Sequence, residues 1–398
     1  MFRKFIIIIF ITTLTLNNMG VIASYTPPKF SASGINKKIY DDISMVKFKQ
    51  VFKNSASERY EKLSIDLRKR YNYSQIVDFI KTLSKSSDVK TFEIGESADK
   101  RKLYSLEIGQ GKTFKMITAG IHARENANPI FLLKYVAILL NDYQSKKKYA
   151  IDLLSKNKLA IVPCVNPDGY MATQFQKKII KNKKLFINKL SDQSIKKFKA
   201  NAKGVDLNRN FPTYLAASSW GGKNTSLVSK KPASAYFAGY SLGSEPETKA
   251  IMTWLLQYIP KATVYVDLHQ SGRAVFYGKP NLSSAYNSKA LGIANAIKKI
   301  TGYVLLSNTK DVIGDNGNGT ITDFAAEVAS DFVYNSTIKR LAPTKSGNNK
   351  VYKYNKLKWK VSICTVETML VSNGPPAARQ TEWVSKKLFQ MFNKIFVT

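Results

Sequence analysis

The chain has 398 residues, of which 44% are apolar and 12% aromatic, and its formal net charge at pH 7 is +35. This length suits one large α/β domain or two smaller ones, and the apolar content excludes a disordered polymer because such a chain can bury a sizeable core. The charge favours anionic partners, although a general excess of lysine is the alternative explanation. No nucleic-acid motif with base-stacking aromatics at repeat spacing is present, so we expect no nucleic-acid partner.

The first 23 residues have the pattern of an export signal. Arg3 and Lys4 precede an apolar stretch at 5–16, and residues 21–23 form a small-residue cleavage site. The apolar stretch is short for a membrane-spanning helix, and an uncleaved anchor is the alternative. We therefore predict a signal peptide at 1–23, export to the periplasm or beyond the cell, and no transmembrane span in the mature chain.

The remaining chain divides into two parts by its patterning. Residues 24–70 are basic and only weakly patterned, which predicts an N-terminal extension, with a short pro-segment as one form of it. Residues 71–398 are more regular and predict a single domain. We expect helices at 73–85, from about 128, from the segment 244–247 to about 258, at 284–300 and from about 381, and strands at 90–96, 102–108, 114–121, 159–165, 262–268 and 361–367.

The segments between these elements are also informative. Residues 166–169, Asn-Pro-Asp-Gly, predict a turn, and Ser244 to Glu247 resemble a capping box. The polar stretch 171–203 predicts a long loop or an exposed helix, and the glycines and asparagines of 314–319 predict a mobile loop. Strands that alternate with long helices predict a three-layer α/β/α sandwich with a mixed, mostly parallel central sheet.

Polar residues follow four of the predicted strands, at the ends where α/β sheets bind their ligands. These residues are His122, Asn166, His269 and Glu367. His122 and His269 are the only histidines in the chain, and Glu125 stands three residues after His122. Two imidazoles and one carboxylate are the donors of an open catalytic zinc site, so the pattern predicts one zinc ion.

Five segments resemble, in this order, zinc metallocarboxypeptidases of the carboxypeptidase A type. They are His-Ala-Arg-Glu at 122–125, Asn-Pro-Asp-Gly-Tyr at 166–170, Gly-Val-Asp-Leu-Asn-Arg-Asn-Phe-Pro at 204–212, Asp-Leu-His at 267–269 and Thr-Val-Glu at 365–367. The resemblance covers about residues 71–398. The segments at 207–212 and 244–248 look most similar to bacterial members, including enzymes that cut peptidoglycan stem peptides at the γ-D-glutamyl–diaminopimelate bond.

The resemblance implies the metal ligands and the general base. His122, Glu125 and His269 would bind the zinc ion, and Glu367 would take a proton from the attacking water and pass it to the leaving amine. The structural alternative for Glu367 is a strand-end carboxylate paired with a lysine.

The resemblance also implies substrate-binding residues. Asn208 and Arg209 would hold the terminal carboxylate of the substrate, since a guanidinium binds a carboxylate through two parallel hydrogen bonds; loop support is the alternative. Arg124 would add positive potential, or form a structural ion pair. Lys199 stands where the family has an arginine that stabilises the oxyanion, and a solvated lysine is the alternative there.

The chain departs from the family at two substrate-related positions. The family's mobile tyrosine has no counterpart near Gly314, and neither Tyr303 nor Tyr334 can be matched to it. Ile321 and Asp323 fall near the position that selects the substrate side chain: isoleucine would favour an apolar group, and aspartate a cationic one.

Cys164 and Cys364 are the only cysteines, and an exported protein could pair them. Both lie in apolar strand-like runs, where a free cysteine behaves as a small buried hydrophobe. The family's strand order would separate these two strands, which implies two free buried thiols.

The sequence thus predicts an exported zinc metallopeptidase that hydrolyses an amide bond next to a carboxylate-bearing end, with peptidoglycan stem peptides as the preferred substrate and an anionic envelope as an allowed partner. A carboxypeptidase that trims proteins or peptides is the alternative within the class. An inactive cationic envelope-binding protein on the same fold is the alternative outside it.

Overall fold

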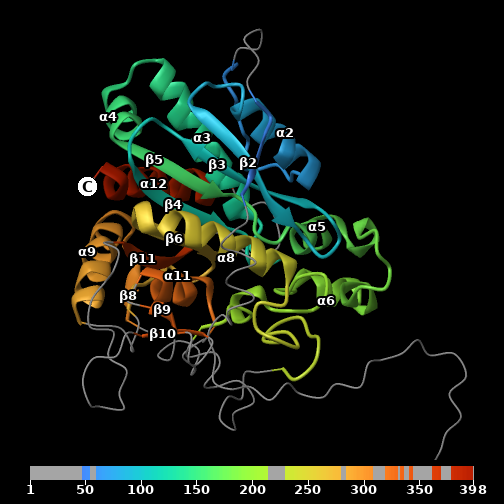
Figure 1. Ribbon diagram of the computed structural model, residues 1–398. Helices are drawn as coiled ribbons and strands as arrows, with labels where there is room; N and C mark the ends of the chain where they lie inside the picture. The colour runs from blue at the N-terminus through green and yellow to red at the C-terminus, as the bar shows by residue number, and fades with distance from the viewer. Residues whose placement is uncertain are drawn as a thin grey trace, which may run out of the picture.

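The computed structural model describes residues 47–53, 60–213, 229–278, 284–307, 319–329, 332–335, 340–343, 361–368 and 378–397 (Figure 1). The predicted signal peptide lies outside these residues, and so do residues 314–318 of the predicted loop at 314–319. Among the described helices, none is long and apolar enough to cross a membrane.

A nine-stranded mixed sheet forms the centre of the described structure. Its strand order is β1-β2-β3-β5-β4-β6-β11-β7-β8, and the four central strands β5, β4, β6 and β11 run parallel. The bounds are β1 Lys49–Val51, β2 Val89–Glu96, β3 Lys102–Ile108, β4 Thr113–Ala119, β5 Asn157–Val162, β6 Ala262–Gln270, β7 Ala274–Phe276, β8 Val304–Leu306 and β11 Ser362–Thr368. A separate hairpin pairs β9, Phe332–Asn335, with β10, Arg340–Pro343.

Helices cover both faces of this sheet (Figure 1). The first face packs against α2, α3, α4 and α12, and the second against α8 and α11. The bounds are α2 Tyr73–Leu83, α3 Ala127–Gln144, α4 Lys148–Lys156, α5 Pro167–Phe175, α6 Asp192–Lys196, α8 Pro246–Tyr258, α9 Ser284–Thr301, α11 Ile321–Ala329 and α12 Ala378–Val397, with short 3₁₀ turns η1 Lys177–Ile179, η2 Phe186–Lys189, η3 Leu207–Arg209 and η4 Ile259–Lys261. The predicted three-layer sandwich is confirmed.

Strand β4 shows why its sequence specifies a central strand. Successive side chains point to opposite faces of a strand. Phe114 and Met116 therefore pack into the core on the α8 side, and Ile117 and Ala119 into the core on the α3 side. Because both faces are covered by helices, the strand is mostly apolar on both faces rather than alternating, although Lys115 and Thr118 lie within it.

Two local predictions were wrong in detail. The predicted turn at 166–169 is the first turn of α5: Pro167 occupies its first position, where an N–H is not needed, and the Asn166 side chain accepts a hydrogen bond from Gly169 N at 3.0 Å. The capping box expected at Ser244 is absent, because Glu245 precedes α8 without a side-chain cap and Ser244 Oγ instead donates to the Glu245 carboxylate at 2.9 Å.

Part of the predicted N-terminal extension belongs to the main body of the molecule. Strand β1 pairs with β2 at the sheet edge. Tyr60, Ile65 and Leu67 are buried in the core to which α3 also contributes, and the Tyr60 hydroxyl donates to Asn141 Oδ1 on α3 at 2.8 Å.

The two cysteines are free and buried, as predicted. Cys164 follows β5, whereas Cys364 lies in β11, and two other strands separate β5 from β11 in the sheet. Burial raises the pKa of the Cys164 thiol, which keeps it protonated and unreactive.

A buried polar group joins the start of α8 to the loops that contain Ala98 and Asn201. Asn201 Nδ2 donates to Glu245 Oε2 at 2.8 Å and to Glu247 Oε2 at 3.2 Å, while Ala98 N donates to Glu247 Oε1 at 2.9 Å. Burial, together with the charges of Asp168 and Glu245, raises the pKa of Glu247 to about 8.

The raised pKa of Glu247 predicts a pH-dependent stability. The folded protein retains a proton that the unfolded chain releases near pH 4.5, so this contribution is complete below that pH and is lost as the pH rises toward about 8. In urea titrations we expect Glu247→Gln to gain about 1 to 4 kcal/mol relative to the parent between about pH 5 and pH 8. Exposed Glu382→Gln serves as control, and parallel pH profiles for parent and Glu247→Gln would contradict the assignment.

Candidate metal centre

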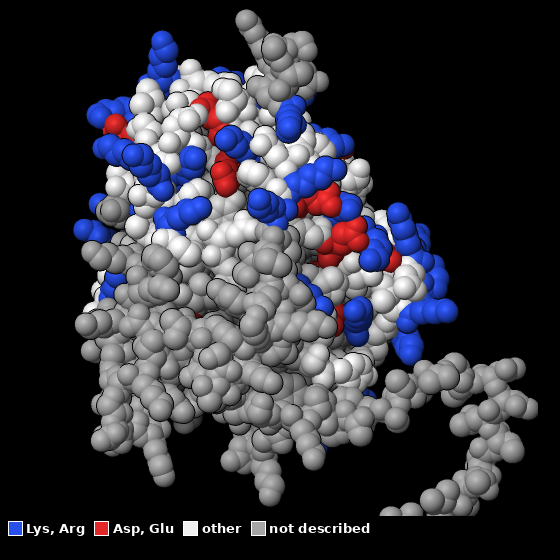
Figure 2. All heavy atoms as spheres, in the orientation of Figure 1, with Lys and Arg blue, Asp and Glu red and all other residues white. Residues whose placement is uncertain are grey.

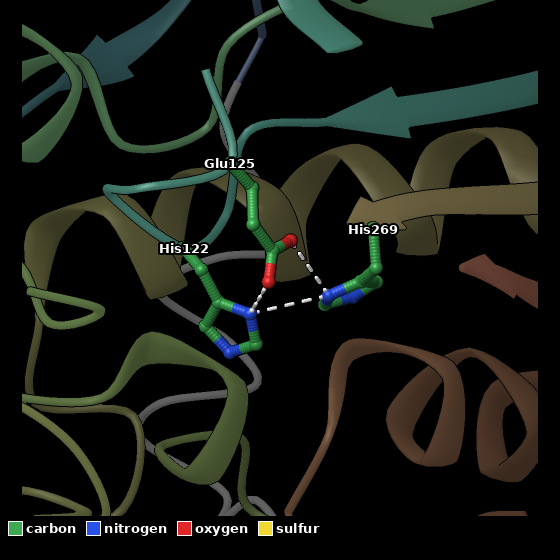
Figure 3. Close-up of side chains that lie close together, drawn as sticks. All are labelled: His122, Glu125 and His269. Atoms are coloured by element: carbon green, nitrogen blue, oxygen red, sulfur yellow. Dashed lines mark hydrogen bonds and ion pairs between the residues drawn. The ribbon is translucent and has the colours of Figure 1, made fainter. Parts of the chain in front are cut away.

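Three side chains predicted to bind metal converge at the carboxyl ends of β4 and β6 (Figure 3). Because these strands are parallel, with Ala119 opposite Leu268, the residues that follow them meet at one edge of the sheet. One ligand atom from each of His122, Glu125 and His269 lies within 4.8 Å of the others, and all three side chains are buried.

The separations within this group are short. His122 Nδ1 is 2.6 Å from Glu125 Oε1, His269 Nδ1 is 3.0 Å from Glu125 Oε2, and the two Nδ1 atoms are 3.2 Å apart. Burial alone would raise the pKa of Glu125, but the adjacent imidazoles outweigh it and hold that pKa below its ordinary value. The donor set of two ring nitrogens and one ionised carboxylate fits an open zinc site.

Two further carboxylates orient the imidazoles. Asp267 Oδ2 lies 2.7 Å from His269 Nε2, and Asp206 Oδ1 lies 3.4 Å from His122 Nε2. Each histidine therefore turns its Nδ1 atom toward Glu125. Burial would raise the pKa of Asp206, but the contact with His122 and nearby positive charges outweigh it and lower that pKa. Carboxylates in this position fix the ring and make it a better metal donor.

Neither carboxylate was predicted to have a role, although both lie in segments that carry the family resemblance. Asp206 stands two residues before Asn208, and Asp267 two before His269. Thr118 on β4 donates to Asp267 Oδ1 at 2.5 Å, so β4 and β6 share one polar link beneath the ligands. An acidic residue two positions before a strand-end histidine was the available signal, since both side chains then point to the same face.

A second set of hydrogen bonds holds the strand ends together. Gln270 Oε1 accepts from Ala127 N at 3.0 Å and Asn128 N at 3.2 Å, which ties the end of β6 to the start of α3. Thr368 Oγ1 lies 3.1 Å from Asn128 Oδ1 and 3.0 Å from His269 O. The Glu125 loop, β6 and β11 are thus linked just beyond the ligands.

Glu367 lies beside the metal group. In the β6–β11 register it stands opposite His269, and its side chain is partly buried. A Cβ atom at Gly272 would come within 2.9 Å of Glu367 Cβ, so this glycine leaves the space that the side chain needs. Burial raises the pKa of Glu367 above its ordinary value.

Lys199 and Arg209 meet at one aromatic ring. Lys199 Nζ is 5.7 Å and the Arg209 guanidinium 6.0 Å from the ring centre of Tyr236. Both positive charges contribute to the lowered pKa of Asp206, the carboxylate that contacts His122. Tyr236 was not foreseen, because nothing in the sequence around it marks a partner for two cations.

Asn208 and Arg124 have different surroundings. Asn208 is buried, and its Oδ1 accepts from Ile321 N at 2.9 Å, so this side chain supports the start of α11. Arg124 is half-buried and forms no ion pair with any described residue, and its Nε atom has no hydrogen bond there. The structural ion pair considered for Arg124 is therefore not found.

The residues near the expected selectivity position are buried in α11 and its cap. Ile321 is the first residue of α11 and is fully buried, while Asp323 Oδ2 accepts from Thr320 N at 3.1 Å. The Asp323 carboxylate therefore caps the start of α11. Tyr303 is buried ahead of β8 and packs in the core on the α3 side.

Residues 76–368 match the zinc carboxypeptidase family, Peptidase_M14, and the chain belongs to this family. Its curated relatives include bovine carboxypeptidase B2, 27% identical over 63% of this chain and 56% of that protein, and human mast cell carboxypeptidase A, 28% identical over 48% of this chain and 42% of that protein. The chain therefore spans about half the length of these two relatives. An inactive metallocarboxypeptidase of Paracoccidioides brasiliensis is 26% identical over 63% of this chain and 42% of that protein.

Solved structures share the fold. Bovine thrombin-activatable fibrinolysis inhibitor aligns with a TM-score of 0.59 at 22% identity, covering 83% of this chain and 97% of that one. Carboxypeptidase A from Helicoverpa armigera aligns with a TM-score of 0.55 at 18% identity, covering 86% of this chain and 76% of that one. The family uses zinc, and the His-Glu-His group fits that metal.

The contact between Asp267 and His269 predicts a measurable effect on metal affinity. Asp267→Asn removes the charge that orients the ring, so we expect zinc to bind about 10- to 100-fold more weakly. Competition with a chelator measures this, and Asp192→Asn, an exposed substitution in α6, is the control. Unchanged zinc affinity in a folded Asp267→Asn protein would contradict the orienting role.

Proposed function

We propose that this chain is a zinc-dependent peptidase that hydrolyses an amide bond next to a carboxylate-bearing end of its substrate. One observation carries the proposal: Glu367 on β11 stands opposite His269 on β6, and His269 forms the candidate metal group with His122 and Glu125. Family membership supports the same activity.

His122, Glu125 and His269 would hold the zinc ion. When bound, zinc acidifies a coordinated water and polarises the scissile carbonyl. Glu367 takes a proton from the attacking water and returns it to the leaving amine. Its raised pKa suits this task, because a base that must later act as an acid works best with a pKa closer to the working pH.

Arg209 and Lys199 provide positive charge near the metal group. Arg209 binds the terminal carboxylate of the substrate through its planar fork, and Lys199 stabilises the developing oxyanion as a point charge. Arg124 adds positive potential next to His122. The side chain of Asn208 accepts a hydrogen bond from Ile321 N at the start of α11. Its backbone carbonyl accepts a hydrogen bond from Arg209 Nη1 at 2.8 Å, which helps to position that guanidinium.

The inactive-protein alternative is less well supported. One relative is named an inactive metallocarboxypeptidase, so the family includes such members. In this chain all three candidate ligands, the candidate base and both orienting carboxylates are present. A relic would be expected to have lost at least one of these groups.

Glu367→Gln tests the mechanism. The amide cannot accept the proton, so we expect kcat to fall at least about 100-fold. Zinc content and thermal unfolding should match the parent, because the substitution is isosteric and Glu367 is not among the proposed ligands. A folded, zinc-loaded Glu367→Gln protein with parental activity would remove the assigned mechanism.

Peptidoglycan stem peptides are the substrate that we propose first, on the likeness of 207–212 and 244–248 to bacterial members. The second candidate is the carboxyl end of an ordinary peptide, which the similarity to carboxypeptidases B2 and A favours. Export to the envelope, through a signal at 1–23, is part of the first proposal.

A direct comparison separates the two substrates. We expect purified enzyme with one zinc ion to cleave a γ-D-glutamyl–diaminopimelate peptide at least about tenfold faster, in kcat/KM, than peptides ending in leucine or lysine. The reverse order would favour the ordinary carboxypeptidase. Cleavage of neither, by protein that contains zinc, would contradict both.

A further inference from the structure

The segment 177–203 concentrates positive charge. It contains ten lysines and one carboxylate, Asp192, so 27 residues carry nine of the 35 net charges of the 398-residue chain. Eight of these lysines have exposed side chains: Lys178, Lys181, Lys183, Lys184, Lys189, Lys196, Lys197 and Lys203. We call residues 177–203 the lysine segment. Figure 2 shows Lys and Arg side chains gathered on the side of the molecule where Figure 1 places α5 and α6.

The lysine segment is a folded unit rather than a charged tail. Ile180, Ile187 and Phe198 are fully buried in a small core of its own. Its backbone is fixed to the rest of the protein, since Lys181 N and Asn182 N both donate to the buried Asp99 carboxylate, at 2.9 and 2.8 Å. The lysines are therefore held as a preformed surface, which lowers the entropy lost on binding.

This segment ends at the metal centre. Ala123, next to His122, packs in the segment's core and donates its N–H to Lys199 O at 3.0 Å. Asn166 Nδ2 donates to Ala200 O at 3.0 Å. The last turn of the lysine segment thus adjoins the loop that presents His122.

The residue types select among anionic partners. All ten cations are lysines, which act as point charges and suit separate carboxylates better than base edges or bidentate phosphates. The two aromatic residues of the segment are Phe186, half-buried, and Phe198, fully buried, so no exposed ring offers a stacking surface for bases. These features favour a chain of spaced carboxylates over nucleic acid.

We propose that the lysine segment docks the acidic stretch of a peptide substrate whose carboxyl end reaches the metal centre. That the docked peptide is a substrate rests on the proposed function, whereas the docking itself does not require catalysis. A γ-linked glutamyl residue leaves its α-carboxyl free, so acidic stem peptides are within the proposed substrate class. Charge held beside a site raises the local concentration of oppositely charged ligands and their association rate.

Two matched variants of the full chain test the docking. The first replaces Lys178, Lys184, Lys189 and Lys196 by glutamine. The control replaces four exposed lysines that lie away from the metal centre: Lys112, Lys156 and Lys261 directly before β4, β5 and β6, and Lys90 at the start of β2. Both lose four charges, so a general effect of net charge would affect them equally.

Binding is measured with fluorescent poly-D-glutamate, which resists cleavage, at several salt concentrations. We expect the first variant to bind at least about tenfold more weakly than the parent and its logarithmic salt slope to fall by about 3, whereas the control stays within about twofold. Equal losses in both variants, or none in the first, overturn the proposal. Tighter parental binding to oligothymidylate of equal charge, or to anionic lipid vesicles, assigns the surface to that other partner and also overturns it.

Kinetics separates failure of the docking from failure of the proposed function. On a peptide with glutamates upstream of the cleaved bond, the first variant should lose at least about tenfold in kcat/KM, and on a neutral peptide it should match the parent. Equal loss on both peptides contradicts docking. Normal poly-D-glutamate binding by a zinc-loaded parent that cleaves neither peptide contradicts the proposed function and leaves the docking surface standing.

Discussion

The parallel register of β4, β6 and β11 is the constraint on which the candidate site depends. It places the ends of three strands side by side, and each end contributes one residue of the candidate site: His122 after β4, His269 in β6 and Glu367 in β11. A slip of one residue in any pairing would turn these side chains to the opposite face of the sheet. The apolar cores on both faces oppose such a slip, so the same packing that stabilises the fold also aligns the site.

Polar contacts then fix the orientation of the side chains that the strand register brings together. Asp206 and Asp267 turn the two imidazoles so that their Nδ1 atoms face Glu125, and Gln270 and Thr368 link the strand ends to α3. These partners come from strands and from a loop fixed by buried hydrogen bonds. Rigid support of this kind allows a small group of ligands to keep one geometry, which a metal centre requires.

Much of this arrangement could be predicted from the sequence, for identifiable reasons. The runs before His122 and His269 are mostly apolar because their strands are buried on both faces, although Lys115 and Asp267 lie within them, and that pattern locates both the strands and their polar ends. The scarcity of histidine made the two ligands conspicuous. In contrast, the Asn-Pro-Asp-Gly segment has the composition of a turn, but it begins α5 because Asn166 caps the helix and Pro167 occupies its first position. The meeting of Lys199 and Arg209 at Tyr236 depends on a loop path that leaves no periodic signal.

The packing of residues 47–53 and 60–67 bears on how this polypeptide can mature. Strand β1 completes an edge of the sheet, and Tyr60, Ile65 and Leu67 pack in the hydrophobic core to which α3 also contributes. A processing protease that removed everything up to residue 70 would strip these side chains from the hydrophobic interior and leave β2 as an open, aggregation-prone border. Cleavage upstream of Lys47 would leave these contacts in place, whereas removal of all of 24–70 would not.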